Sequence, residues 1–513
     1  MSLDAGTGGA KCFLIDVGTG KFYSSYHEWH YTFPDEAQPG GVEFSPKVFW
    51  KILVKVIHEI LSKSGVPSDR IIAVSSTSQR EGIVLLDKDG KELYGGPNID
   101  FRFTAEINRI ITPYLQELYR TSGHWPIPMF APYRLLWFKQ YKPELYERID
   151  KVLMINDWIL YKLSGVKFSE WTNAVETLLF DLKEKRWNKR LIQALNLNPD
   201  IFPPVKAPGT KIGEVTNEIA AITGLKAGTP VVTGGADTQC AMIGIGVVDP
   251  GQVGAVLGTF APVMMPVKNP IIDQEYRTWS GCHLPPELWV IESSAVHSGS
   301  SIRWFRDTFF NLENSFLKNG PIDTYQYMDY LAAKSPLGSH GVYAFLGANI
   351  PNYRILQTTS GGFILTEMDM SRSLSKGDFI RAIYESIGFA IRGNIKRIER
   401  VTNINCIDLR ITGGCSKSKI LPQIIADVTG LPVSIPVCKE SSSLGAAIAA
   451  GVGVGLYKDF REGIDKLVKW ETTYKPSKDR KKEYDILYDR WLKWKDIIYG
   501  LKNSNGSKGG QNE

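Results

Sequence analysis

The first segment that could carry chemistry is the glycine-rich turn at residues 4–9 (DAGTGG), which follows a short apolar stretch. Its glycines would let backbone N–H groups approach a phosphate, Thr7 supplies a hydroxyl, and the carboxylate of Asp4 can hold Mg²⁺ directly or through water. No G-K-[ST] follows, so this is not a Walker A loop, and the glycines lack the spacing of a dinucleotide fingerprint. Glycine-rich hairpin turns are common, so the motif alone predicts either a phosphate site or a plain turn.

A second candidate is the segment GGAD at residues 234–237, which places a carboxylate directly after a flexible turn at the end of an apolar strand. Transfer of a phosphoryl group to an alcohol needs a base that accepts the hydroxyl proton and orients the oxygen for in-line attack, and Asp237 suits that role. The alternative interpretation is that Asp237 caps a helix over residues 238–244. Both interpretations can hold at once.

The third candidate is TGGCSKS at residues 412–418, between a strand expected over 407–411 and a helix expected over 420–428. Its glycines would let a flat nucleotide base or a ribose lie against the backbone at a helix N-terminus. A plain loop is equally compatible with this segment.

The elements around these motifs alternate between strand and helix patterns, which favours mixed α/β sheets. The opening segment predicts a strand over 10–15 with a partner over 22–31, then a helix capped by Ser45 that begins at Pro46 and stops near residues 65–67. The same patterns predict a strand over 71–75, a hairpin from 82–86 with its turn at 87–90, helices through 106–161 with a core stretch at 135–138, and a hairpin opening at 251–260. Only two residues precede the strand end at residue 3, so we expect a shortened first strand.

A chain of 513 residues exceeds the size of a single hydrophobic core, so two domains are expected. The Gly-Thr turn at residues 6–7 recurs at 258–259, which is consistent with a duplicated domain although no residue-level repeat proves it. We place an N-terminal domain at 1–249 and a C-terminal domain at 250–500. Residues 504–513 have nothing to bury and should form a disordered tail.

The composition, 43% hydrophobic and 22% charged, is that of a globular enzyme, and no stretch is apolar for the ~20 residues of a membrane span. No secretory signal is visible, so we expect a cytoplasmic protein without a membrane partner. The six cysteines form no C-x-x-C pair and should be reduced, mostly buried thiols. A net charge of +6 is slight, and the basic cluster at 478–482 is interpreted as a solvated helix start, so no nucleic-acid partner is expected. A homodimer is left open.

Taken together and in order, the motifs resemble those of the FGGY carbohydrate kinase family along nearly the whole chain. The segments that carry the resemblance are 3–8, 78–81, 98–102, 234–237, 257–259, 298–304, 413–414 with 423–427, and 439–440 with 443–447. The resemblance implies an α/β fold of two duplicated actin-like (ribonuclease H-like) domains with an interdomain cleft. It also implies that the N-terminal domain binds the sugar and that the C-terminal domain binds ATP with Mg²⁺.

The resemblance assigns roles to individual residues. Asp237 matches the catalytic base, and Asp4 and Asp237 match the positions associated with magnesium. Positions that match phosphate or nucleotide contacts are Thr7, Gly8, Gly258, Thr259, Gly299, Arg303, Gly413, Gly414 and Ser418. Positions expected to line the substrate pocket are Gln79, Arg80, Glu81, Asn98, Asp100 and Thr238. Among these, Arg80 and Glu81 match the pair that hydrogen-bonds substrate hydroxyls in glycerol-type members.

Two departures from the family pattern affect the sugar pocket. Asn98 stands where many members carry a tryptophan, and Thr238 replaces a glutamine that commonly follows the catalytic aspartate. The runs 78–85, 304–307, 322–325 and 439–455 are most similar to the members that phosphorylate the primary hydroxyl of a small open-chain dihydroxypentanedione signal. Glycerol, xylulose and other pentuloses remain alternative substrates.

The implied mechanism is that domain closure brings a primary hydroxyl to Asp237 and the γ-phosphate of ATP into line with it. Backbone N–H groups near residues 6–8 and 258–259 would stabilise the transferring charge. The actin-like scaffold also serves chaperone-type ATPases and filament proteins, which form the alternative from a different class. The pair Arg80 and Glu81 argues against that class, because such proteins need no polyol-binding constellation. A dead sugar-binding regulator is disfavoured because both Asp4 and Asp237 are present.

Overall fold

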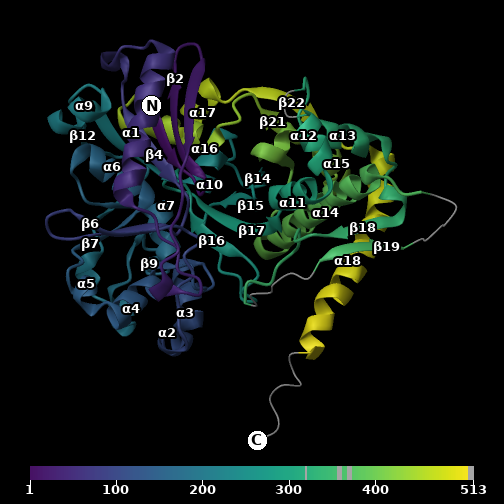
Figure 1. The fold of residues 1–513 in the computed structure, drawn as a ribbon, viewed down its shortest axis with the longest axis horizontal. Coiled ribbons are helices and arrows are strands. Elements are labelled where there is room, and N and C mark those ends of the chain that lie inside the picture. Colours follow the sequence, from purple (N-terminus) through teal and green to yellow (C-terminus); the bar gives the residue numbers. More distant parts are fainter. Residues whose placement is uncertain (318–319, 355–360, 367–372, 506–513) are drawn as a thin grey trace, which may run out of the picture. The chain divides into compact units, whose positions relative to one another are not determined.

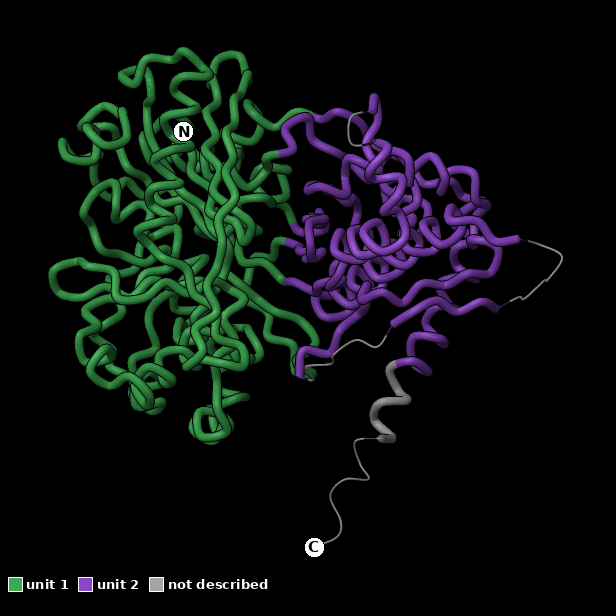
Figure 2. Tube along the Cα trace, viewed as in Figure 1, with its two compact units in different colours: residues 1–249, 266–291, 440–469 green, residues 250–265, 292–439, 470–513 purple. Residues whose placement is uncertain are grey.

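The computed structural model of the chain describes residues 1–317, 320–354, 361–366 and 373–505. These residues form two compact units (Figure 2). Unit 1 comprises residues 1–249, 266–291 and 440–469, and unit 2 comprises residues 250–265, 292–439 and the chain from 470 onward. The chain thus changes unit at 249/250, where the sequence analysis places its domain boundary, and then returns to unit 1 twice.

Unit 1 is built on a six-stranded sheet of order β12-β13-β4-β1-β2-β3 (Figure 1). Its strands are β1 (Ser2–Ala5), β2 (Gly9–Ile15), β3 (Phe22–Glu28), β4 (Val74–Ser78), β12 (Lys211–Glu214) and β13 (Pro230–Ala236). The three central strands β13, β4 and β1 are parallel, whereas β2, β3 and β12 are antiparallel to their neighbours. The opening hairpin predicted from the sequence is confirmed, and the strand expected over 71–75 lies three residues later.

Helices cover both faces of this sheet. Along β1 the side chains alternate: Leu3 and Ala5 belong to the hydrophobic core that includes residues of α1 (Pro46–Ser64) and α6 (Ile155–Ser164). On the other face, the Ser2 hydroxyl donates to the carbonyl of Ser443 in α16 (Ser441–Gly453) at 2.7 Å, and α10 (Asp237–Gly244) packs on α16. Successive residues of a strand point to opposite faces, so Asp4, two residues after Ser2, also faces α16.

Helix α1 begins as its sequence predicts. Ser45 is the N-cap and accepts a hydrogen bond from the Val48 N–H, Pro46 occupies the first helical position, and Gly65 ends the helix at a φ of 65°.

The predicted helical stretch 106–161 contains five helices but is interrupted by β7. The remaining elements of unit 1 are β5 (Ile83–Leu86), β6 (Glu92–Gly96), α2 (Ala105–Ile111), α3 (Leu115–Ser122), α4 (Ala131–Tyr141), α5 (Pro143–Glu147), β7 (Lys151–Met154), β8 (Ser169–Glu170), α7 (Trp171–Ala174), β9 (Phe180–Asp181), β10 (Arg186–Trp187), α8 (Lys189–Ala194), β11 (Val205–Lys206), α9 (Asn217–Thr223), β16 (Trp279–Cys282) and α17 (Phe460–Leu467).

Unit 2 repeats this sheet topology. Its strands follow the order β17-β15-β14-β20-β21-β22, with bounds β14 (Gln252–Val256), β15 (Phe260–Val267), β17 (Trp289–His297), β20 (Asp408–Thr412), β21 (Val433–Pro436) and β22 (Trp470–Tyr474). Strands β14, β20 and β21 are parallel, and β15 and β22 run antiparallel to their neighbours. Strand for strand this matches β3-β2-β1-β4-β13-β12 of unit 1, so the duplicated architecture expected from the two Gly-Thr turns is confirmed.

The other elements of unit 2 surround this sheet. They are α11 (Gly299–Phe309), α12 (Asn311–Leu317), α13 (Thr324–Lys334), β18 (Val342–Phe345), β19 (Gly362–Leu365), α14 (Lys376–Thr402), α15 (Leu421–Thr429) and α18 (Lys478–Asn505). Trp491 of α18 is fully buried and its ring lies 5.9 Å from those of Phe345 and Phe389. The basic cluster at 478–482 starts this helix, as predicted.

Three further expectations concern chain properties. Helix α18 continues through Asn505, and residues 506–513 of the expected tail lie outside the described residues. All six cysteines are free; five of them are buried and Cys415 is half-buried. No helix within the described ranges is both long and apolar enough to cross a bilayer.

Candidate active site

Three parallel strands of unit 1 deliver polar residues to one edge of the sheet. Ala5 of β1 and Ala236 of β13 both pair with Ser78 of β4, so the three strands end at the same level. The chain continues from these ends into the Gly6 turn, into Gln79 and Arg80, and into Asp237. Ligands of α/β sheets bind outside the carboxyl ends of such strands, so this edge is the candidate site.

Asp237 is half-buried and occupies the first position of α10. The N-cap is Ala236, and the Asp237 carboxylate accepts a hydrogen bond from the N–H of Thr238 at 2.7 Å. Burial raises the pKa of Asp237 to about 7; Arg80 opposes this shift and Asp4 adds to it. A carboxylate that titrates near neutrality and interacts with Arg80 and Asp4 has the properties of a general base. The N-cap role, which was the alternative interpretation of Asp237, belongs to Ala236.

Arg80 is held by a buried acidic partner that the sequence analysis did not single out. Its guanidinium lies 3.6 Å from the carboxylate of Glu176, and Glu176 lies 3.2 Å from Nε2 of His124. His124 Nδ1 lies 3.0 Å from the carbonyl of Ser122, so both ring nitrogens lie near oxygen atoms. The Arg80 guanidinium also lies 5.9 Å from the Trp279 ring. The result is a charged cluster beside the candidate base.

The electrostatics of Glu176 follow from this cluster. Burial would raise the pKa of Glu176, but the nearby His124 and Arg80, with a smaller contribution from Gln239, lower it to about 2. Glu176 is therefore ionised across the physiological range. Neither Glu176 nor His124 belongs to a motif, because their partners come from distant segments. A charged residue within the apolar stretch 174–180 was the one available signal.

Glu81 adopts an unusual backbone conformation next to Arg80. It is buried and has a φ of 60°, which is costly for a residue with a side chain. The fully buried guanidinium of Arg134 holds this loop: it donates to the carbonyls of Glu81, Met129 (2.9 Å), and Gly96 and Pro97 (3.2 Å each). Arg134 therefore fixes the two loops that carry Glu81 and Asn98.

Gln79 links the turn after β1 to the loop that carries Asn98. Its side-chain oxygen accepts the Asn98 N–H at 3.0 Å, and its amide nitrogen lies 3.5 Å from the Gly6 carbonyl and 3.3 Å from the Tyr31 hydroxyl. The exposed hydroxyl of Thr7 lies 3.4 Å from Asn98 Oδ1. The structure thus brings together the predicted residues Thr7, Gln79 and Asn98.

Asp100 is fully buried and its carboxylate is occupied by protein groups. It accepts hydrogen bonds from the Arg102 side chain at 2.9 and 3.0 Å, from the Val42 N–H at 3.2 Å, and from the Tyr94 hydroxyl. These contacts favour a positioning role for Asp100 instead of the direct substrate contact predicted from the sequence. Thr238 is buried too, and its hydroxyl donates to the Gln239 side chain at 2.6 Å.

Asp4 lies in a mixed-charge group. Its carboxylate accepts a hydrogen bond from the Ser443 hydroxyl at 3.3 Å, and Lys11, ion-paired with Glu440, lies nearby. Burial raises the pKa of Asp4, Glu440 adds to the shift, and Lys11 opposes it. No group of three or more metal-ligating side chains occurs in the described part of the chain. Mg²⁺ commonly binds one or two carboxylates and completes its shell with waters and phosphates, so Asp4 and Asp237 fit that ion.

In unit 2, three predicted segments contact one another. The turn at Gly258 and Thr259 accepts backbone hydrogen bonds from the start of α11, with Gly299 N–H donating to the Gly258 carbonyl at 2.9 Å and Ser298 N–H to the Thr259 carbonyl at 3.1 Å. The Cys415 N–H donates to the Leu257 carbonyl at 3.1 Å. Backbone groups therefore build this surface.

Two glycines permit this close packing. A Cβ on Gly299 would lie 2.5 Å from the Gly258 carbonyl oxygen, and a Cβ on Gly413, which has a φ of +92°, would lie 2.6 Å from the Leu257 carbonyl oxygen. Gly414, by contrast, is exposed and a Cβ there would have no atom within 4 Å. Gly414 is thus open to a ligand. Arg303 of α11 is exposed and lowers the pKa of Cys415, which burial raises to about 11.

Ser418 is tied to α13. Its hydroxyl donates to Asp329 at 2.7 Å, the Lys419 N–H donates to the same carboxylate at 2.8 Å, and the Tyr384 hydroxyl donates to it at 2.9 Å. The Ser418 oxygen also accepts the Leu421 N–H at 3.1 Å. Ser418 therefore anchors the start of α15, and Asp329 is a positioning residue that the sequence analysis missed.

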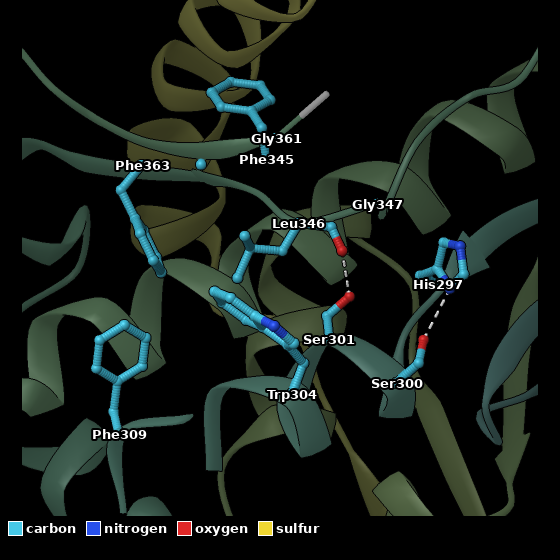
Figure 3. Close-up of a pocket in the computed structure, with 11 residues that line it drawn as sticks. His297, Ser300, Ser301, Trp304, Phe309, Phe345, Leu346, Gly347, Gly361 and Phe363 are labelled. Carbon is cyan, nitrogen blue, oxygen red and sulfur yellow. Dashed lines mark hydrogen bonds between the residues drawn. The ribbon is translucent and has the colours of Figure 1, made fainter. Parts of the chain in front are cut away.

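A cavity of about 440 Å³ lies beside this surface in unit 2 (Figure 3). Its lining residues are His297, Ser300, Ser301, Trp304, Phe309, Phe345, Leu346, Gly347, Gly361, Gly362 and Phe363. None of the residues predicted to contact nucleotide is among them. Within the cavity wall, His297 Nδ1 and the Ser300 hydroxyl lie 2.8 Å apart, and the Ser300 hydroxyl donates to the Thr259 carbonyl at 3.0 Å.

Two protein-family models match the chain, one over its N-terminal half and one over its C-terminal half. The N-terminal domain model of the FGGY family of carbohydrate kinases matches residues 1–244, and the C-terminal domain model matches residues 253–454. The chain therefore belongs to the FGGY family of carbohydrate kinases.

Several individual relatives and solved structures are similar to this chain over nearly its full length. Autoinducer-2 kinase from Yersinia enterocolitica is 35% identical over 96% of this chain and 93% of its own length, and autoinducer-2 kinase from Escherichia coli K12 is 34% identical over the same shares. Among solved structures, xylulose kinase from Lactobacillus acidophilus has a TM-score of 0.84 at 21% identity, over 97% of this chain and 99% of its own. A glycerol kinase from Plasmodium falciparum, solved with ADP, has a TM-score of 0.80 at 21% identity, over 96% and 97% of the two chains. These structures share the fold.

Proposed function

We propose that the protein transfers the γ-phosphoryl group of ATP to a primary hydroxyl of a small sugar-like substrate, with Asp237 as the base. The single observation that carries the proposal is the meeting of three strand ends in unit 1, where Asp237, with a pKa of about 7, interacts with both Arg80 and Asp4. A base of this pKa can take the hydroxyl proton at neutral pH while Arg80 binds a substrate oxygen.

Substrate recognition is assigned to the groups around Asp237. Arg80 is oriented by Glu176, and its guanidinium would bind a hydroxyl or carbonyl oxygen of the substrate. Glu81 and Asn98 lie on the two loops that Arg134 holds, and they supply further polar contacts. Thr238 and Gln79 stabilise this arrangement by their bonds to Gln239 and Asn98.

Nucleotide binding is assigned to unit 2. The turn at Gly258 and Thr259 would face the phosphates, and Gly299, Arg303, Gly413 and Gly414 would contact the base or ribose. The exposed position of Gly414 and the exposed side chain of Arg303 support this assignment. Asp4 and Asp237 would hold Mg²⁺ together with the phosphate oxygens, where the ion would neutralise the charge that develops during transfer.

Among substrates, we propose autoinducer-2 in its open-chain dihydroxypentanedione form. The support is the identity of 34–35% to autoinducer-2 kinases over nearly the full length. Xylulose and glycerol are the second candidates, because kinases of both share the fold at about 21% identity. A chaperone or filament ATPase is disfavoured, since such a protein needs no polyol-binding group like Arg80, which the buried Glu176 and His124 hold next to the proposed base.

The proposal is tested by measuring ADP release from ATP and Mg²⁺ with each of five acceptors: the autoinducer-2 precursor, glycerol, xylulose, ribulose and erythritol. We expect the highest kcat/KM with the autoinducer-2 precursor, and phosphorus NMR of the product should show a phosphomonoester on the primary carbon. Faster turnover of a pentulose or of glycerol would reassign the substrate. Release of ADP that is independent of all five acceptors would contradict kinase activity.

A further inference from the structure

Behind Asp237 lies a buried pair of side chains, Glu170 and Thr172, that the proposed reaction does not use. Both are fully buried. Glu170 ends β8 and caps α7, since its carboxylate accepts the N–H groups of Thr172 at 2.7 Å and Asn173 at 3.3 Å. Its own N–H donates to Asp157 at 3.1 Å. The pair is therefore fixed to the backbone of α7 and to α6.

The hydroxyl of Thr172 joins this pair to β13, the strand that ends directly before Asp237. Thr172 Oγ1 lies 2.8 Å from the backbone nitrogen of Ala236 and 2.6 Å from Oε2 of Glu170. A backbone N–H can only donate, so the hydroxyl oxygen accepts from Ala236 and its proton goes to Glu170. The chain of hydrogen bonds has one direction, from Ala236 through Thr172 to Glu170.

This acceptor lies at the end of β13. The register between β13 and β4 shifts between Val232 and Gly235, and pairing resumes at Gly235 and Ala236, the two residues directly before Asp237. A Cβ on Gly235 would lie 2.8 Å from Thr172 Oγ1, and one on Gly234 would lie 1.9 Å from the Ser76 carbonyl oxygen. The two glycines of the GGAD motif let the strand end pass between β4 and Thr172.

We propose that Glu170 and Thr172 form a latch that positions Asp237 by holding the Ala236 peptide directly before it. They are positioning residues and do not touch the substrate. This inference rests on the proposed function, because it requires Asp237 to be the base. Orientation of a reacting group contributes strongly to rate, so the loss of this bond should affect kcat more than binding.

The test compares Thr172→Val with Thr172→Ser. Valine keeps the shape but leaves the Ala236 N–H without its acceptor, and serine restores the hydroxyl. We expect Thr172→Val to lower kcat roughly 10- to 100-fold, with KM for ATP unchanged. Thr172→Ser should recover most of kcat.

Thr233→Val is the matched control, because Thr233 is also buried in β13 and its hydroxyl donates to Ala207 at 2.7 Å and accepts from Thr210 at 2.8 Å. It should lower the melting temperature with kcat near the wild-type value. Equal kcat for Thr172→Val and Thr233→Val would overturn the latch. If Thr172→Val does not fold, Thr172→Ala, which also lacks the hydroxyl, replaces it, and an unaltered kcat would again overturn the latch. A wild-type protein inactive on all five acceptors would overturn both proposals, whereas an active wild type with an equally active Thr172→Val overturns the latch alone.

Discussion

The two units carry the same sheet but end their matching strands with different chemistry. After β1 and after β14 comes a Gly-Thr turn in both units. After β4, unit 1 continues into Gln79, Arg80 and Glu81, whereas after β20 unit 2 continues into Gly413 and Gly414. Unit 1 thus builds its site from charged side chains, and unit 2 builds its surface from backbone.

This difference matches the two tasks that we assign. Orienting one hydroxyl and removing its proton needs fixed charges and a shifted pKa, which the buried Glu176 and the half-buried Asp237 supply. Holding a phosphate chain and a flat base needs close approach of the backbone, which glycines supply. A duplicated scaffold has therefore been specialised by the residues that follow matching strands.

The largest effect is expected for Asp237→Asn, which removes the base with little change in shape. kcat should fall roughly 10²- to 10⁴-fold, because general base catalysis contributes that much. ATP binding, measured by calorimetry, should persist because it is assigned to unit 2. Turnover near the wild-type rate would show that Asp237 is not the base and would remove the contrast between the units.

Two substitutions of glycine probe the backbone surface of unit 2. Gly299→Ala places a Cβ 2.5 Å from the Gly258 carbonyl oxygen, so it should weaken ATP binding and lower stability by about 1–3 kcal/mol. Gly414→Ala meets no atom within 4 Å in the protein, so any loss of ATP affinity there reports on bound nucleotide alone. We expect a raised KM for ATP with an unchanged melting temperature in Gly414→Ala.

Gly362→Ala is the control for this pair, since a Cβ there also has no neighbour within 4 Å and Gly362 is outside the predicted nucleotide contacts. It should leave both KM for ATP and the melting temperature near wild type. If Gly414→Ala behaves like Gly362→Ala, the nucleotide does not lie against Gly414.

Strong local signals were sufficient to predict much of the fold. The cap at Ser45, the turns at Gly6 and Gly258, and the apolar strand before Asp237 each act within a few residues, and the structure has the predicted elements at all of them. The strand expected over 71–75 was misplaced by three residues because residues 74–78 (VSSTS) are polar in sequence yet fully buried. Such a strand forms because layers on both faces of the sheet bury it, and the local sequence pattern does not show this burial.

The charged cluster of unit 1 could not be predicted in full for the same reason. Arg80 was found because it lies in a motif, but its partners Glu176 and His124 come from segments almost 100 and about 45 residues away along the chain. A resemblance assigns Asp100 to the substrate pocket but does not show its contacts, and in the structure its carboxylate accepts hydrogen bonds from Arg102 and Tyr94. Tertiary pairing of charges is set by the fold.

Glu176→Gln tests whether the unit 1 cluster matters for substrate recognition. It leaves Arg80 and His124 without the buried carboxylate of Glu176, which should lower the free energy of unfolding by about 1–3 kcal/mol. Because Arg80 is then no longer oriented, KM for the acceptor should rise about tenfold while KM for ATP stays constant. Glu214→Gln is the control, because its pair with Lys211 is exposed on both sides and should contribute little. Equal kinetics for the two variants would mean that Arg80 needs no partner to bind substrate.

The smallest expected effect is a pH-dependent change in melting temperature, and it distinguishes a catalytic carboxylate from a structural one. The pKa of Asp237 is raised in the folded protein from 3.8 to about 7, so the protonated form is favoured by folding. Its contribution to stability is present below about pH 4 and is lost as the pH rises through 7. Asp237→Asn should therefore melt at the same temperature as the wild type at pH 4 but at a higher temperature at pH 8, by about 2–4 °C for each kcal/mol regained.

Glu176→Gln should instead melt at a lower temperature than the wild type at pH 8, because the pKa of Glu176 is lowered to about 2 and its ionised form stabilises the fold at that pH. Thermal melts of both variants at the two pH values test this, and a lower melting temperature for Asp237→Asn at pH 8 would show that the ionised Asp237 stabilises the fold and that its raised pKa is not the cost of a catalytic position.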